Sequence, residues 1–476
     1  MNYSGIGFGC YRIDVSITEH YDSLFNALEN GINVIDTSSN YYDGGSEKLI
    51  GKVLNDIHEK GILKRNSIVL VTKGGYIQGQ NYQYALQLEK EGALFDEVVK
   101  FQDRLWHCIN PGFLEQQINL QLERLNQHYI DVYLLHNPEY YLSLAQNNGI
   151  DLNDARTEYY ARIKKAFEFL EQKVKDGKIL SYGISSNTFI EYSDNYEFTS
   201  LEKIISIANE VSPDNHFSTI QFPLNLLESG SVTIKNQINN SLTIPELAKT
   251  NNIKVLLNRP LNAIMSKGLV RFADFETDAF TEKDFIKQMK LVSLMEDDIL
   301  NEKIINEDIT PEDKELFGKL LDIGKVVEEN WKFFGSIENF NDVITRTFAP
   351  KISKLIKLTD KKIKNPDIAE FTDKYVKESY LLLNYVSKYY KVRADKRSKY
   401  IHSLIDSLLE EKYHGLTLSQ KTLLILKSVD GVDCVLAGLR KEKYVKDALR
   451  ILNEPKIHNA CKIIEYVSKE VEYSNT

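Results

Sequence analysis

Four residues in this chain carry complementary proton-transfer chemistry. Each stands at the end of an apolar, β-prone run or in the turn that follows one: Asp36, Tyr41, Lys73 and His136. A carboxylate, a phenol, an ammonium group and an imidazole that meet at one end of a sheet can transfer a proton to or from a bound molecule. Each residue alone has an ordinary structural explanation, but the four together favour a catalytic site.

The four side chains suit the reduction of a carbonyl group. Tyrosine is a weak acid at neutral pH, because its unperturbed pKa is about 10, and the ammonium group of Lys73 would lower the pKa of Tyr41. Asp36 would hold Lys73 in its charged form, and His136 would donate a hydrogen bond to a carbonyl oxygen. Reduction also needs a hydride, which no side chain supplies, so a nicotinamide cofactor is implied.

The elements that must position these residues alternate between strands and helices. Apolar strand-like runs recur with connections long enough for helices, which is the pattern of parallel βα units. Eight such runs lie near residues 5–9, 32–36, 67–72, 130–136, 179–185, 217–222, 254–258 and 432–437. The sequence therefore predicts a closed (β/α)8 TIM barrel, whose active site lies at the carboxyl ends of the strands.

One long segment interrupts the alternation between the seventh and eighth strands. Residues 272–412 form far more chain than one barrel helix needs. Leu382, Tyr385, Val386 and Tyr389 recur with the spacing of an amphipathic helix. We expect a barrel domain made of residues 1–271 and 413–476, and a helical insertion subdomain over 272–412 that could also dock a protein partner.

Composition narrows the class of protein. The formal charge of −9 over 476 residues disfavours general binding to nucleic acid. No apolar run approaches the roughly 20 residues that a membrane span needs. The four cysteines lack the spacing of metal ligands or of a disulfide framework, so no metal site is expected and a reducing compartment is favoured. Without a secretory signal at the N-terminus, we expect a cytoplasmic protein.

Several motifs resemble those of the aldo-keto reductase superfamily. Gly7-Phe-Gly-Cys-Tyr-Arg12 is similar to the first-strand motif of the family. The stretch from Gly31 to Tyr41, followed by Gly45-Ser-Glu47, resembles its acid and tyrosine signature. Leu122-Glu-Arg-Leu125, leading to Asp131-Val-Tyr-Leu-Leu-His136-Asn-Pro138, resembles its second signature. The likeness leaves the insertion unexplained.

The resemblance implies site residues and a cofactor. It assigns Asp36, Tyr41, Lys73 and His136 to the catalytic tetrad, with Tyr41 as general acid in reduction and general base in oxidation. It also implies NADPH, with NADH as an alternative, and a small carbonyl or sugar-like substrate. The positions that it assigns to the cofactor are Ser185, Ser186, Asn187, Gln221, Asn258, Arg259, Gly438 and Arg440.

Parts of this cofactor site depart from the family pattern. Asn258 stands where relatives often place an aromatic that stacks on the nicotinamide. An extra serine before Asn187 leaves the carboxamide partner open between Ser186 and Asn187. Arg440 could face a 2′-phosphate, which would favour NADPH.

Three functions remain open at this level. The first is an NADPH-dependent reductase of aldehydes, ketones or sugar-like carbonyls. The second is a non-catalytic protein that keeps the barrel and the nucleotide while the insertion binds a partner. The third is a sugar dehydrogenase that uses NAD.

Overall fold

The computed structural model describes residues 2–265, 268–304 and 308–474. The chain divides into two compact units. Unit 1 comprises Met1–Leu261 and Ile405–Thr476, and unit 2 comprises Asn262–Leu404. The division expected from sequence, at residues 272 and 412, places the hairpin of β11 (Asn262–Met265) and β12 (Gly268–Arg271) with the barrel, whereas this hairpin falls within unit 2.

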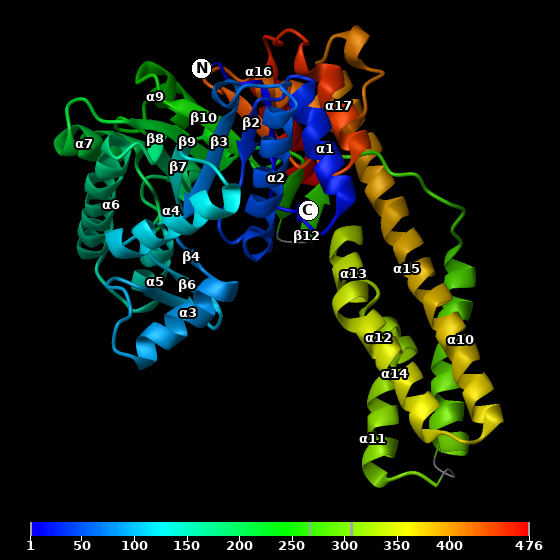
Figure 1. Cartoon of the computed structure of the whole chain (residues 1–476). Coiled ribbons are helices and arrows are strands. Elements are labelled where there is room, and N and C mark those ends of the chain that lie inside the picture. Colours follow the sequence, from blue (N-terminus) through cyan, green and yellow to red (C-terminus); the bar gives the residue numbers. More distant parts are fainter. Residues whose placement is uncertain (1, 266–267, 305–307, 475–476) are drawn as a thin grey trace. The chain divides into compact units, whose positions relative to one another are not determined.

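Unit 1 contains a closed barrel of eight parallel strands (Figure 1). Around the barrel the strand order is β1-β13-β10-β9-β8-β7-β3-β2. The strands are β1 (Ile6–Gly9), β2 (Val34–Asp36), β3 (Val69–Gly74), β7 (Ile130–His136), β8 (Ile179–Ser185), β9 (Phe217–Pro223), β10 (Lys254–Asn258) and β13 (Cys434–Ala437). All eight predicted strands are present, and the predicted (β/α)8 barrel is confirmed.

The barrel interior is filled by small and branched apolar side chains, as such barrels require. This layer consists of Val34, Val69, Val71, Val132, Leu134, Leu256, Cys434 and Leu436. Strand β8 approaches β9 so closely that a Cβ atom on Gly183 would lie 1.8 Å from the carbonyl oxygen of Thr219. Only glycine therefore fits this position, two residues before Ser185.

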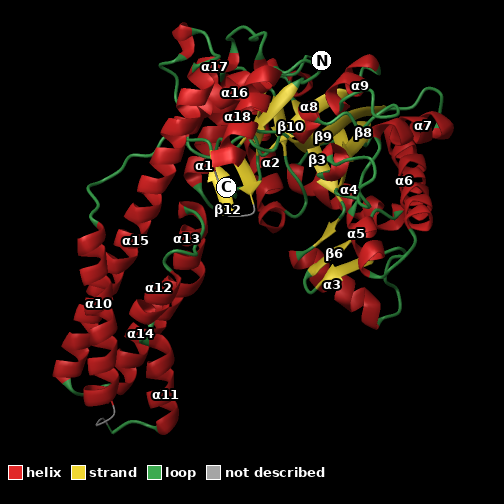
Figure 2. Ribbon diagram, turned by 180° about the vertical axis from the view of Figure 1, so that it is seen from behind, coloured by secondary structure: helices red, strands yellow, loops and turns green. Residues whose placement is uncertain are grey.

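Helices surround the strands of unit 1 (Figure 2). They are α1 (Thr18–Glu29), α2 (Gly45–Glu59), α4 (Pro111–Leu125), α5 (Tyr140–Asn147), α6 (Leu152–Lys175), α7 (Leu201–Val211), α8 (Gly230–Thr233), α9 (Ile244–Thr250), α16 (Leu418–Ser428), α17 (Glu442–Leu452) and α18 (Ala460–Ser474). Helix α4 begins at Pro111 and is capped by Asn110, whose side chain accepts from the N–H of Gly112. Proline suits a first helical turn because its missing N–H would have no partner there.

A small sheet is inserted between β3 and α4. It has the order β4-β6-β5, with β4 (Tyr76–Ile77), β5 (Val99–Gln102) and β6 (Leu105–His107), and it is accompanied by α3 (Gly79–Lys90). Tyr76 of β4 pairs with His107 of β6. The sheet follows Lys73 by only a few residues, so it lies at the carboxyl end of β3.

Unit 2 is helical with one hairpin. Its elements are β11 (Asn262–Met265), β12 (Gly268–Arg271), α10 (Glu282–Asp298), α11 (Pro311–Leu320), α12 (Ile323–Asn330), α13 (Ile337–Val343), α14 (Ala349–Lys362) and α15 (Pro366–Asp406), which runs on into unit 1. Leu382 and Val386 are buried in its core, and Tyr385 and Tyr389 pack against that core. The amphipathic helix predicted from these four residues is confirmed.

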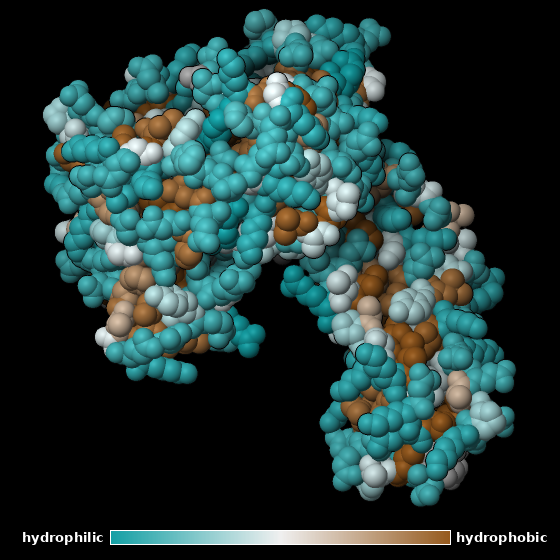
Figure 3. All heavy atoms as spheres, in the orientation of Figure 1, coloured by the Kyte–Doolittle hydropathy of each residue, from teal (hydrophilic) through white to brown (hydrophobic). Residues whose placement is uncertain are grey.

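Apolar side chains also reach the surface of unit 2 (Figure 3). Leu294 is 66% exposed and Phe333 is 79% exposed. Within the described ranges, no helix combines the length and the apolar character that crossing a bilayer requires.

Candidate active site

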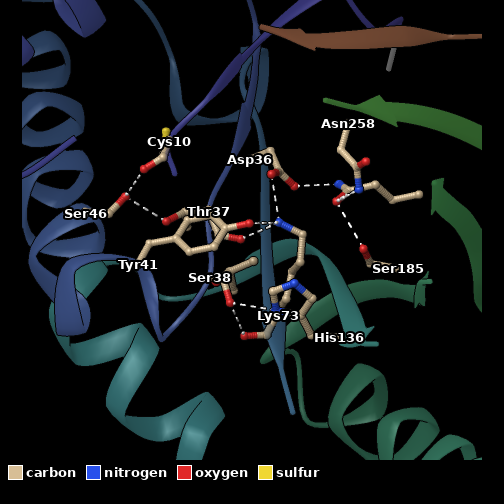
Figure 4. A network of polar contacts seen from close by, with 12 residues as sticks. Cys10, Asp36, Thr37, Ser38, Tyr41, Ser46, Lys73, His136, Ser185 and Asn258 are labelled. Carbon is tan, nitrogen blue, oxygen red and sulfur yellow. Dashed lines mark hydrogen bonds and ion pairs between the residues drawn. The ribbon is translucent and has the colours of Figure 1, made fainter. Parts of the chain in front are cut away.

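Asp36 and Lys73 form a buried ion pair at the carboxyl ends of adjacent strands (Figure 4). Lys73 Nζ lies 2.7 Å from Asp36 Oδ2 and 2.8 Å from the carbonyl oxygen of Thr37. It lies 3.5 Å from the hydroxyl of Tyr41. An ammonium group has three N–H donors, and these three oxygens account for all of them.

Tyr41 opens a strained turn after β2. It begins the 3-10 helix η1 (Tyr41–Gly44), in which Tyr42 has φ 47° and Asp43 has φ 53°. Left-handed backbone is uncommon for residues other than glycine and clusters at functional sites. The turn directs the Tyr41 ring toward Lys73, whose Nζ lies 5.1 Å from the ring centroid.

The expectation that Lys73 lowers the pKa of Tyr41 is wrong. Burial raises the pKa of Tyr41 well above its ordinary value, and the Asp36 carboxylate raises it further. The ammonium group of Lys73 does not offset this, because it is held 2.7 Å from Asp36 and is farther from Tyr41. The phenol is therefore protonated.

His136 is a buried imidazole beside the phenol. Burial lowers its pKa well below the ordinary value, and Lys73 and His107 lower it further, so the ring is neutral. Ser38 Oγ lies 3.0 Å from His136 Nδ1 and 2.7 Å from Asn40 Oδ1. The Ser38 hydroxyl donates its single proton to Asn40 Oδ1, and the direction of its contact with Nδ1 depends on the imidazole tautomer. In the tautomer with the proton on Nε2, the ring can donate a hydrogen bond to a ligand oxygen.

A second buried network holds the backbone of Lys73. Glu47 accepts hydrogen bonds from Thr72 at 2.9 Å, from Gln121 at 2.9 Å and from Arg124 at 2.6 Å. Gln121 also donates to the carbonyl oxygen of Lys73 at 3.0 Å. The sequence motifs around Glu47 and Arg124 thus join α2, α4 and β3 behind Lys73.

Three candidate cofactor residues form a chain that leads back to Asp36. Gln221 donates to Asp36 Oδ1 at 2.8 Å and accepts from Ser185 at 3.1 Å. Asn258 Nδ2 lies 3.4 Å from Gln221 Oε1, and Asn258 Oδ1 is buried without a hydrogen-bond partner in the described part of the chain. An unpartnered buried oxygen is costly, so this atom is suited to accept a hydrogen bond from a ligand.

A family model described as "Aldo/keto reductase family" matches residues 5–317. The chain belongs to this family. The match covers the first seven barrel strands and ends within unit 2, so the last strand, β13, lies beyond it.

Curated relatives of this aldo-keto reductase match only in part. A stretch of 140 residues is 29% identical to the NADH-specific methylglyoxal reductase of Escherichia coli (strain K12), covering 29% of this chain and 37% of that protein. A stretch of 190 residues is 24% identical to the NAD(P)H-dependent D-xylose reductase I,II of Candida tropicalis, covering 38% of this chain and 48% of that protein. The chain thus spans about half or less of the length of these relatives.

Solved structures give a further comparison. The glycerol dehydrogenase AKR11B4 from Gluconobacter oxydans has a TM-score of 0.46 at 14% identity, covering 98% of this chain and 92% of that one. The holo form of aldo-keto reductase AKR11C1 from Bacillus halodurans has a TM-score of 0.46 at 14% identity, covering 97% of this chain and 91% of that one.

Not all predicted cofactor residues of the aldo-keto reductase are available to a ligand. Ser186 is buried, and its hydroxyl lies 3.2 Å from that of Thr188, so it shapes the loop. Arg259 forms an ion pair of 2.7 Å with Glu228. The exposed Gly438 and the half-exposed Arg440 lie between β13 and α17, where a Cβ atom on Gly438 would meet nothing within 4 Å.

Glu139 fixes the loop that carries Ser186 and Asn187. It is buried, and it accepts a hydrogen bond of 2.8 Å from the N–H of Asn187. Burial raises its pKa to about 7, and the bond from Asn187 offsets part of this rise. This residue, two positions beyond Asn137, was not among the predicted site residues.

Aromatic residues of the inserted sheet pack against His136. The Tyr76 ring lies edge-on to the His136 ring with centroids 4.6 Å apart, and His107 Nε2 donates to the carbonyl oxygen of His136 at 2.7 Å. A Cβ atom on Gly75 would lie 2.6 Å from each of these two hydrogen-bonded atoms, so glycine permits the contact. Tyr76 and Ser38 were not among the predicted site residues, although Ser38 stands close to Asp36 and Tyr76 close to Lys73 in the chain.

Proposed function

We propose that this aldo-keto reductase reduces the carbonyl group of an aldehyde, ketone or sugar-like molecule with NADPH. The observation that carries the proposal is the position of Lys73, whose ammonium group bridges Asp36 at 2.7 Å and Tyr41 at 3.5 Å. A neutral, buried His136 lies beside this group, with its ring centroid 6.2 Å from that of Tyr41. These four residues supply an acid, its electrostatic support and a neutral hydrogen-bond donor.

Tyr41 acts as the general acid in reduction. Its raised pKa keeps the proton on the phenol until a carbonyl oxygen gains negative charge. The proton then moves from Tyr41 Oη to that oxygen, which leaves a hydroxyl group on the product and a phenolate on the protein. Lys73 stabilises the phenolate, and Asp36 holds Lys73 in place. In oxidation the same phenolate accepts the proton.

His136 orients the substrate. In the tautomer that carries its proton on Nε2, the imidazole donates a hydrogen bond to the carbonyl oxygen without giving up a proton. The edge of Tyr76 limits the rotation of the ring. His136 and Tyr41 therefore aim two donors at one oxygen.

The residues fit a nicotinamide cofactor. Ser185, Gln221 and Asn258 present polar atoms at the ends of three neighbouring strands, and Asn258 Oδ1 lacks a partner within the described residues. This oxygen suits the amide N–H of a carboxamide, so Asn258 would hold the ring by hydrogen bonding in place of stacking. When bound, the cofactor supplies the hydride that no side chain can supply. Arg440 would pair with a 2′-phosphate and favour NADPH, while NADH remains an alternative.

The proposal is tested by mixing the purified chain with NADPH or NADH and a panel of aldehydes, ketones and sugars. We expect the cofactor absorbance to fall in proportion to product, and faster with NADPH. Saturable binding of NADPH without turnover of any carbonyl or of the matching alcohols would contradict the proposal and favour the non-catalytic alternative. Turnover only from alcohol to carbonyl with NAD would favour the sugar dehydrogenase.

Two further expectations belong to this proposal. The chain has four unpaired cysteines, three of them buried, which supports a reducing, cytoplasmic compartment.

Binding of a protein partner through unit 2 stays a prediction, supported by the exposed Leu294 and Phe333. If unit 2 binds a protein partner, the double change Leu294→Ser and Phe333→Ser should abolish that binding. The turnover of carbonyl substrates should not change. Association that survives both changes would contradict it.

A further inference from the structure

Unit 2 contains a small, partly open hollow whose charged lining is mostly positive. One face of α15 contributes Tyr390, Arg393 and Arg397, at the i, i+3 and i+7 positions of one helix face. Strand β12 contributes Arg271, and the start of α13 contributes Glu338. Three guanidinium groups and one carboxylate thus give the lining a formal charge of +2.

The single carboxylate of the lining already forms an ion pair with an arginine. Glu338 Oε1 lies 3.3 Å from Arg271 Nε, and both side chains are largely shielded from solvent. Arg393 donates to the hydroxyl of Tyr389 at 3.0 Å, a neutral partner that leaves its charge uncompensated. Burial lowers the pKa of Arg397, the neighbouring Arg393 lowers it further, and Glu338 offsets only part of this.

Like charges are held together here by packing. Tyr390 is anchored by a hydrogen bond of 2.8 Å from its hydroxyl to the carbonyl oxygen of Trp331, which fixes this turn of α15. Its ring stacks on Phe340 of α13, with centroids 6.1 Å apart. The rigid frame keeps Arg393 and Arg397 facing the hollow, although they repel each other. An anion placed there would remove that repulsion.

We propose that this hollow is a binding site for a phosphate group, carried either by free phosphate or by a small phosphate monoester. A phosphate dianion matches the charge of +2, whereas a carboxylate would neutralise half of it. Planar guanidinium groups bind phosphate oxygens in pairs of parallel hydrogen bonds. The partly open hollow has a volume of about 30 Å³, so the site takes a small group and leaves the rest of a larger ligand in solvent.

The test is calorimetric titration of the full chain, without nicotinamide cofactor, with inorganic phosphate, glycerol phosphate and acetate. We expect saturable binding of one phosphate group per chain, at least tenfold tighter than binding of acetate. Tighter binding of glycerol phosphate would identify an organic phosphate as the ligand, and equal binding would identify free phosphate. Absence of saturable binding of either would overturn the proposal.

Matched variants distinguish specific phosphate binding in the hollow from non-specific attraction of phosphate to positive charge. Arg397→Gln should weaken phosphate binding at least tenfold, and Arg397→Lys should weaken it less because the charge remains. Lys396→Gln removes one charge from an exposed position of the same helix outside the hollow and should leave binding unchanged. Equal weakening by Lys396→Gln would overturn the proposal.

A second variant, Arg393→Gln, controls for the case in which Arg397→Gln misfolds. Arg393 is exposed, so Arg393→Gln should leave the melting temperature unchanged and still weaken phosphate binding. Unchanged binding by both arginine variants would overturn the assignment. The titration involves no turnover, so its failure would leave the proposed reductase function standing.

Discussion

Gln221 on β9 donates a hydrogen bond of 2.8 Å to Asp36 on β2. These two strands stand opposite each other in the barrel order, so the bond crosses the mouth of the barrel. It joins a predicted cofactor residue to the carboxylate that holds Lys73. In the proposed reaction, this network would couple the positions of the cofactor and of Lys73.

The change Gln221→Leu tests this coupling. It removes the donor to Asp36 and the acceptor for Ser185. We expect steady-state kinetics to show a higher KM for NADPH and a lower kcat together, each by about tenfold, which corresponds to about 1.4 kcal/mol. A change in the KM alone, with kcat intact, would show that Gln221 serves the cofactor only.

Asp36 and Lys73 should depend on each other for stability. The Lys73 side chain is fully shielded and that of Asp36 is 6% exposed, so removal of either partner leaves a buried charge. Urea unfolding should show that Asp36→Asn or Lys73→Met costs about 3–5 kcal/mol. The double variant should cost clearly less than the sum of the two. Additive losses would contradict a direct interaction.

Glu139 should make stability depend on pH. Its pKa is about 7 in the folded protein and 4.5 without the fold, so the neutral form is favoured by folding. This contribution is fully present below pH 4.5 and is lost as pH rises to about 7. Relative to Glu139→Gln, the wild-type chain should lose about 3 kcal/mol of unfolding free energy across this window. A difference in unfolding free energy between the wild-type chain and Glu139→Gln that does not change with pH would contradict the assignment.

Arg440 should set the preference for NADPH. It is half-exposed in the loop before α17. Fluorescence titration of Arg440→Ala should show NADPH binding weakened about tenfold or more, because one charge-assisted contact is lost, while NADH binding is unchanged. Lys443→Ala, an exposed change in the same segment, should affect neither cofactor. Equal weakening of both cofactors by Arg440→Ala would assign it to a shared part of the nucleotide.

The barrel was predictable because its strands are short apolar runs that end in polar residues. The proximity of Asp36, Lys73 and His136 followed, because parallel strands bring these residues to one end of the barrel. Long-range contacts were not predictable: nothing in the sequence indicates that Gln221 reaches Asp36. The pKa of Tyr41 was misjudged because burial and Asp36 outweigh Lys73.

A short sequence pattern also failed to predict the local structure where a contact outside the pattern competes with it. Ser16-Ile-Thr-Glu19 has the spacing of a capping box, but α1 begins at Thr18 and Ser16 donates to Asp14. By sequence, Trp106 and His107 could serve either as substrate-loop residues or in loop packing; Trp106 packs on Tyr82, and His107 supports the backbone of His136. These contacts depend on the fold, because Tyr82 lies on α3 and His136 lies on β7.

The role of Tyr41 is tested most directly by hydride transfer in a single turnover. Tyr41→Phe removes only the hydroxyl that lies 3.5 Å from Lys73 Nζ, and Tyr42→Phe removes a neighbouring phenol on a residue that is 51% exposed. With an aldehyde and bound NADPH, Tyr41→Phe should slow hydride transfer about 10²–10⁴-fold at unchanged NADPH affinity. Tyr42→Phe should transfer hydride at the wild-type rate. Equal rates for Tyr41→Phe and the wild-type chain would contradict the assignment of Tyr41 as the general acid.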